Sequence, residues 1–64
     1  MNKFVEVTRA KVEDNQGPRV VINVAEILNL QEGPSNRGVI HFSLGAPLVT
    51  VETYDELRGI LLAN

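Results

Sequence analysis

The chain has 64 residues, no cysteine and a formal net charge of −2 at pH 7. A chain of this length forms one small domain, which we place at residues 1–64, and it buries only about 60% of the surface that its unfolded form exposes. The lack of cysteine excludes disulfides, and the slightly acidic balance argues against sequence-blind binding to nucleic acid. No segment has the length of a membrane span and the N-terminus has no signal-peptide pattern, so we expect a cytoplasmic protein with no membrane partner.

So small a core contributes little stability. Small domains compensate with disulfides, a structural metal or association with another chain. The sequence has no cysteine and no cluster of metal ligands, so we predict association, most simply a two-fold homodimer. A stable monomer is the alternative, because many domains of this size fold alone.

The first third of the chain predicts two strands. Alternation over residues 3–8 predicts a strand whose one face carries Val5 and Val7. The Asp-Asn-Gln-Gly-Pro run at residues 14–18 predicts a turn. Residues 19–24 predict a second strand, and we place it at the centre of the sheet because both of its faces are largely apolar.

The middle of the chain allows two interpretations. Residues 23–26 fit a bulge or tight bend that leads into a third strand over residues 27–31. A short helix over residues 25–30 is the competing prediction, because the apolar spacing does not settle the period. Residues 32–38 then predict a loop, since they are rich in Gly, Pro, Ser and Asn.

A hairpin follows the second loop. Residues 39–44 predict a strand with Ile40, Phe42 and Leu44 on one face. After a tight Gly-Ala-Pro connection, residues 48–51 predict a last strand that pairs back on it.

The C-terminus predicts a helix of about nine residues, too short to be stable unless it docks on the sheet. Thr53 and Glu56 have the spacing of a capping box. Gly59 weakens the helix by about 1 kcal/mol relative to Ala, which points to a close approach to a strand or a partner chain. The apolar stripe consists of Leu57, Ile60 and Leu61. The predicted fold class is therefore α+β, a small antiparallel sheet of four to five strands with one C-terminal helix packed on it.

Three segments together carry a family resemblance: Phe4-Val5-Glu6-Val7-Thr8, then Val21-Ile22-Asn23-Val24 with Ile27, then Val49 through Leu57. This progression resembles the small flagellar proteins of the FlbD kind and their phage and prophage relatives. The resemblance covers nearly the whole chain through structural motifs, and the two loops are longer here than is typical of that family. It implies a role in motility or, in a phage, inhibition of a host protein, and it transfers no catalytic residue.

A second set of segments, Val7-Thr8-Arg9, Ala46-Pro47 and Val49-Thr50-Val51, is similar to the carbon-storage-regulator family. That resemblance implies a strand-swapped dimer that binds RNA through arginines on its edge strands. Thr53-Tyr54-Asp55 stands here where that family has a basic residue, and the net charge differs. Nucleic acid is therefore not the partner that we expect.

No group of residues predicts catalysis. His41 is the one histidine, and Ser43 is its neighbour on the same strand face, but no motif supplies an oxyanion hole. We interpret His41 as a half-exposed strand residue. The turn glycines match no phosphate-binding motif, so we predict no enzymatic activity, no cofactor and no metal site.

Six side chains are the candidates for binding: Arg9, Lys11, Arg19, Arg37, His41 and Tyr54. Arg9 and Lys11 share a strand parity, and Arg19 lies across from them if the first two strands pair. Such cations suit a phosphate-like anion or an acidic protein surface, and the alternative is a solvated polar face. Tyr54 is either an interface anchor or a packing residue at the helix start.

The sequence thus predicts a small, non-catalytic interaction protein, oligomeric, that binds and modulates a larger protein partner. Its first alternative is an oligomer that holds a small nucleotide-like anion between protomers. Its second alternative is an RNA-binding regulator of the carbon-storage type.

Overall fold

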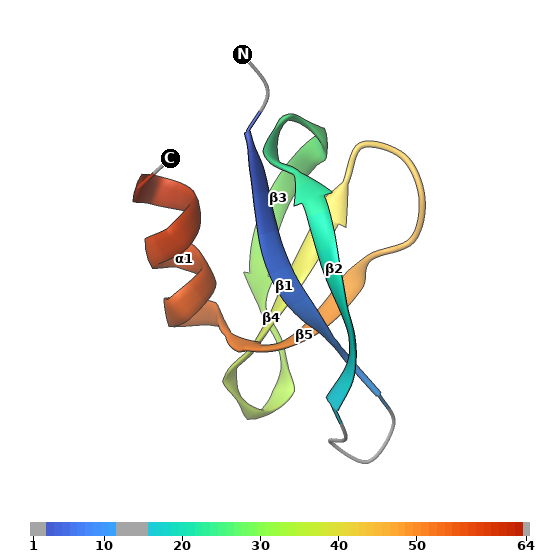
Figure 1. Cartoon of the computed structure of the whole chain (residues 1–64). Helices are drawn as coiled ribbons and strands as arrows, with labels where there is room; N and C mark the ends of the chain where they lie inside the picture. The colour runs from blue at the N-terminus through green and yellow to red at the C-terminus, as the bar shows by residue number, and fades with distance from the viewer. Residues whose placement is uncertain (1–2, 12–15, 64) are drawn as a thin grey trace.

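In the computed structural model, which describes residues 3–11 and 16–63, five strands form an antiparallel sheet with one α-helix packed on it (Figure 1). The strands are β1 (Phe4–Ala10), β2 (Gln16–Asn23), β3 (Ile27–Glu32), β4 (Arg37–Phe42) and β5 (Leu48–Thr53), and the helix is α1 (Tyr54–Ala63). Two 3-10 turns, η2 (Val24–Glu26) and η3 (Pro34–Asn36), lead into β3 and β4. The predicted α+β class is confirmed.

The strands follow the order β2-β1-β5-β4-β3 across the sheet. The β1–β2, β3–β4 and β4–β5 pairs join strands that are adjacent in sequence. The β1–β5 pair joins the two ends of the chain, with Arg9 opposite Thr50. Thus β1 and β5 lie inside the sheet, whereas β2 and β3 are its two edges.

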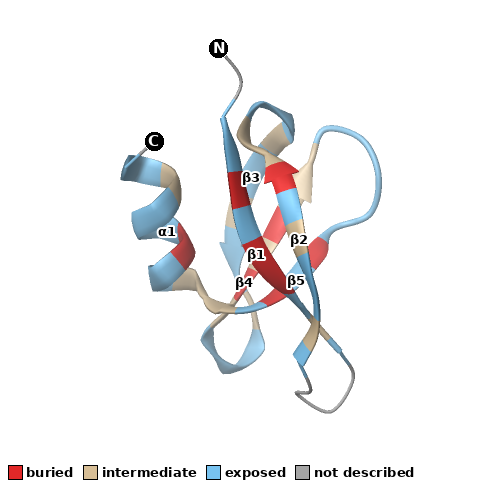
Figure 2. Ribbon diagram, viewed as in Figure 1, coloured by how far each residue is buried: buried red, intermediate tan, exposed pale blue. Residues whose placement is uncertain are grey.

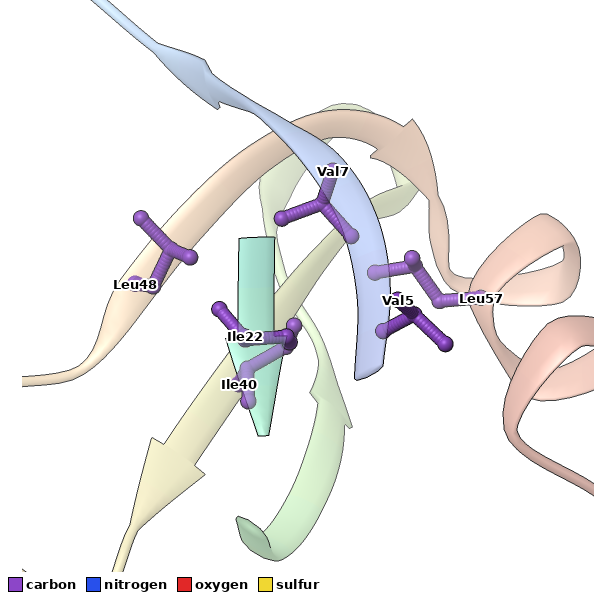
Figure 3. Packing of buried hydrophobic residues seen from close by; sticks show 6 residues of the cluster. All are labelled: Val5, Val7, Ile22, Ile40, Leu48 and Leu57. Atoms are coloured by element: carbon purple, nitrogen blue, oxygen red, sulfur yellow. The ribbon is translucent and has the colours of Figure 1, made fainter. Parts of the chain in front are cut away.

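Among the described residues, six apolar side chains form the buried core: Val5, Val7, Ile22, Ile40, Leu48 and Leu57 (Figure 3). They come from β1, β2, β4, β5 and α1, so the helix and four of the strands share one interior. Leu57 of α1 is completely buried. Figure 2 shows the buried residues as short red stretches of the strands and of α1, with exposed residues between them. Val5 and Val7 share one face of β1, as predicted, and that face is buried.

The central position predicted for the second strand is wrong, because β2 is an edge of the sheet. Its inward face contributes Ile22 to the core, but Val21 on the outward face is 63% exposed. Apolar residues on both faces of a strand therefore do not show that it is central in the sheet. The outer face of β2 is apolar at Val21, yet nothing in the described structure covers it. Part of the predicted turn is also strand, since β2 begins at Gln16, and the rest of that turn lies outside the described residues.

The third strand is confirmed, and the competing helix over residues 25–30 is wrong. The chain bends through η2, where the Asn23 side-chain oxygen accepts the N–H of Ala25 at 3.0 Å, and then enters β3. The register between β3 and β4 breaks at Leu28, which is exposed. The predicted second loop is shorter than expected, because it contains only Gly33 and η3 between the two strands.

The strand predicted over residues 39–44 ends two residues early. Ser43 donates both its N–H and its hydroxyl to the carbonyl of Glu26, at 3.0 and 3.2 Å. These bonds hold Ser43 against η2, and the chain then leaves the sheet. Leu44 therefore lies in the connection to β5 and is 86% exposed, and it does not share a strand face with Ile40 as predicted.

The predicted capping box at the start of α1 is confirmed. The N–H of Glu56 donates to the Thr53 hydroxyl at 3.1 Å, and the N–H of Thr53 donates to a Glu56 carboxylate oxygen at 2.9 Å. Leu57 and Leu61 face the core, but Ile60 is exposed, so the apolar stripe is narrower than predicted. The predicted close approach of Gly59 to a strand is wrong, because a Cβ there would have no atom within 4 Å.

Replacing Thr53 with Ala should lower the free energy of unfolding by about 1 kcal/mol, because the capping hydroxyl is lost. Thr53→Ser keeps that hydroxyl and should stay close to the wild type. Urea unfolding of the three proteins measures the difference. Equal midpoints for Thr53→Ala and Thr53→Ser would show that the cap does not stabilise the helix start.

Candidate functional site

An exposed apolar patch lies on the outer face of β4 and β5. It consists of the exposed Val49 and Val51 and the half-buried Val39, and we call it the β4–β5 patch. Val39 and Val49 are directly opposite each other, and the next pair along, Ile40 and Leu48, is buried in the core. Alternation along a strand then turns the valines away from the core, and Val49 and Val51 are 40% and 37% exposed. Within the described residues, no second layer covers this face.

Polar side chains border the β4–β5 patch on the side of β3. His41 lies two positions beyond Val39 on β4, and its Nε2 donates to the side-chain oxygen of Gln31 on β3 at 2.9 Å. Ser43 donates instead to the carbonyl of Glu26, so His41 and Ser43 have different partners. The border therefore offers an imidazole and an amide for hydrogen bonding beside an apolar centre.

Arg9 and Arg37 lie on either side of the same residue, Thr50. Arg9 is opposite Thr50 across the β1–β5 pair, and Nη1 of Arg37 donates to the Thr50 carbonyl at 3.5 Å. Arg37 is half-buried, whereas Arg9 is exposed at the end of β1. Arg37 thus ties β4 to β5 at the edge of the β4–β5 patch.

Arg19 is separate from this pair, on the outer face of β2. It is opposite Thr8, and its Nη1 lies 3.7 Å from a carboxylate oxygen of Glu6 on the neighbouring strand. Both partners are largely exposed, so this ion pair contributes little stability. Lys11 is exposed beside Gly17, where an added Cβ would lie 3.2 Å from its Cγ.

Tyr54 is the first residue of α1 and is half-buried directly after the capping residue Thr53. Of the six candidate side chains, the structure brings His41 and Arg37 to the β4–β5 patch. It places Arg19 on β2 with an acidic partner, and Tyr54 at the helix start.

A second exposed apolar pair lies on the outer face of β1 and β2. Phe4 is opposite Asn23 and Glu6 is opposite Val21, so Phe4 and Val21 are diagonal neighbours on one face. Phe4 is 60% exposed. This pair lies next to the free edge of β2.

The valines of the β4–β5 patch were not among the functional candidates predicted from the sequence. One feature of the last strand could have identified them, because residues 48, 49 and 51 are apolar and so occupy both faces. A five-stranded sheet with one helix covers only one of its faces, so some of these side chains must remain exposed.

Over residues 3–11 and 16–63, no three side chains of the metal-binding types gather where they could hold an ion. In the same part of the chain, no helix is long and apolar enough to cross a bilayer. Comparisons of the chain with protein-family models, with curated proteins and with solved structures find no match. The resemblance to FlbD-type proteins accordingly stays a prediction.

Proposed function

We propose that this protein is a non-catalytic, oligomeric interaction protein that binds a larger protein partner through the β4–β5 patch. One observation carries the proposal. Val49 and Val51 are exposed on one face of β5, and Val39, which is half-buried, lies directly opposite Val49 on β4. Exposed apolar side chains that are contiguous mark interaction surfaces, whereas scattered ones are ordinary.

The composition of the β4–β5 patch suits protein recognition. Its three members are β-branched valines held on paired strands, so they lose little rotamer freedom when a partner covers them. His41 and Gln31 supply a polar border, which matches the apolar centre and polar rim of protein interfaces. The modulating role, inhibition of a host protein or a part in motility, rests on the family resemblance.

A comparative capture experiment tests the proposal. The wild-type protein, Val49→Lys/Val51→Lys and the control Leu62→Lys are immobilised and exposed to a lysate of the source organism. Leu62 is also an exposed apolar residue, but it lies on α1. The partner should be retained by the wild type and by Leu62→Lys, and reduced at least tenfold by the double variant, which corresponds to about 1.4 kcal/mol. Equal retention by all three proteins contradicts the proposal.

A further inference from the structure

The backbone hydrogen bonds of β2 show which of its residues point toward the open edge of the sheet. The N–H of Val24 donates to the carbonyl of Lys3 at 2.9 Å, which continues the β1–β2 register. In an antiparallel pair, hydrogen-bonded residue pairs alternate with pairs that exchange no bonds. Val20 and Ile22 therefore bond to β1. The backbone groups that turn away from β1 belong to Arg19, Val21 and Asn23.

A hydrogen bond on β1 independently shows that the backbone groups of Arg19 point away from β1. Thr8 is opposite Arg19, and its N–H donates to the Glu52 carboxylate at 2.8 Å, on the side of β1 that faces β5. Thr8 and Arg19 thus exchange no bonds with each other. The backbone groups of Arg19 must point to the other side, where none of the strands in the described residues lies.

From Arg19 to Asn23, the open edge of β2 lacks the devices that usually block edge strands, whereas Pro18 and a register shift lie just before this stretch. Natural edges carry bulges, prolines or lysines that prevent pairing with another chain. β3, the other edge, has its register break at Leu28 and lies in contact with α1. Between Arg19 and Asn23, by contrast, the paired register of β2 is unbroken and contains no proline and no lysine.

We propose that two copies of this chain pair antiparallel along β2, with the two-fold axis through Val21. This dimer specifies how the oligomer of the proposed function is built, and it rests on that part of the proposed function. The two Val21 residues then exchange both of their backbone hydrogen bonds. The N–H of each Asn23 donates to the Arg19 carbonyl of the second copy. With this axis, the residues whose backbone groups point to the open edge, Arg19, Val21 and Asn23, lie opposite Asn23, Val21 and Arg19 of the second copy.

The side chains favour a second copy over an unrelated strand. In this register Val20 is opposite Ile22 of the second copy on the inner face, so apolar meets apolar. On the outer face Arg19 is opposite Asn23, so no like charges are opposed. The two Val21 side chains meet at the axis, and each has Phe4 beside it on its own β1. Pairing therefore brings the two exposed Val21 side chains into contact, with a Phe4 beside each of them on the same face.

Cysteine cross-linking tests the axis directly, because the chain contains no native cysteine. In Val21→Cys the two Cα atoms across a hydrogen-bonded pair would be about 5.5 Å apart, a distance that a disulfide bridges. The control is Arg19→Cys, whose two copies would be offset by four residues, or about 13 Å along the strand. Under mild oxidation Val21→Cys should form a covalent dimer at least tenfold faster than Arg19→Cys. Equal rates overturn the proposed register.

Sedimentation equilibrium tests the dimer without cross-linking. The wild type should dimerise at or below about 100 μM, and Val21→Lys should raise the dimer dissociation constant at least tenfold by opposing two ammonium groups. Leu62→Lys should leave the constant unchanged. A monomeric wild type at that concentration overturns this inference.

The two proposals fail separately. A monomeric wild type whose partner capture still depends on Val49 and Val51 overturns the β2 dimer and leaves partner binding standing. If the dimer depends on Val21 but all variants capture the partner equally, the β2 dimer stands and partner binding through the β4–β5 patch is overturned. A third outcome is a monomeric wild type that captures the partner, together with a Val21→Lys variant that does not. This outcome would show that a strand of another protein pairs with the β2 edge, and would overturn the second copy as its occupant.

Discussion

Gly38→Ala should lower the free energy of unfolding by about 2–3 kcal/mol, because the new methyl group has no room. Gly38 lies on β4 and is buried under α1. A Cβ at this position would overlap the Cδ1 atom of Leu57 and would lie 3.2 Å from the hydroxyl oxygen of Thr50. A core of this size supplies only about 3–5 kcal/mol in total, so the variant should be partly unfolded at room temperature.

The matched control for this prediction is Gly59→Ala. It makes the same chemical change in an exposed helical position, where a Cβ would have no atom within 4 Å. Alanine has the higher helix propensity, so this variant should be up to about 1 kcal/mol more stable than the wild type. Urea unfolding monitored by circular dichroism measures both variants. Midpoints that shift in the same direction would show that α1 does not pack on Gly38 as described.

Local features of the fold could be predicted from the sequence because their causes lie within a few residues. The capping box needs only Thr53 and Glu56, three positions apart, and both of its bonds are present. The buried face of β1 follows from simple alternation at Val5 and Val7. In these elements the structure is determined by interactions between residues close in sequence, and a sequence pattern can therefore predict it.

Strand order could not be predicted, because it depends on which distant segments meet. The pairing of Arg9 with Thr50 connects residues at opposite ends of the chain, and no local pattern specifies it. The position of β2 was predicted wrongly for a related reason. An apolar residue such as Val21 looks the same in the sequence whether its own chain, a second chain or nothing covers it.

The candidate site was only partly predictable. His41 and Arg37 were identified by residue type, and both lie at the β4–β5 patch. The valines of the patch were not identified, because apolar residues on a strand are ordinarily assigned to the core. What distinguishes Val49 from Leu48 is the side of the sheet on which α1 packs, and that depends on the tertiary fold.

The junction between β1 and β5 depends on a side chain that takes the place of a backbone acceptor. Thr8 is buried, and its N–H donates to the Glu52 carboxylate at 2.8 Å, where a regular ladder would supply a carbonyl. β5 has a bulge here. Val39 pairs with Val49 and Arg37 pairs with Thr53, so the single residue Gly38 on β4 lies opposite three residues, 50–52, on β5. The buried Thr50 hydroxyl holds the bulge, because it lies within hydrogen-bonding distance of two carbonyls, those of Gly38 at 3.0 Å and Glu52 at 2.9 Å.

Glu52→Ala should therefore lower the free energy of unfolding by about 2 kcal/mol, because it leaves the buried N–H of Thr8 without its acceptor. Glu52→Gln keeps an oxygen in place and should lose less than half of that amount. Glu32→Ala, which removes an exposed carboxylate from β3, should have almost no effect. Urea unfolding measures these losses, and hydrogen exchange at the Thr8 amide, at least tenfold faster in Glu52→Ala, would locate the effect at the β1–β5 junction. If Glu52→Ala matched Glu32→Ala in both measurements, the two ends of the chain would be held together by core packing alone.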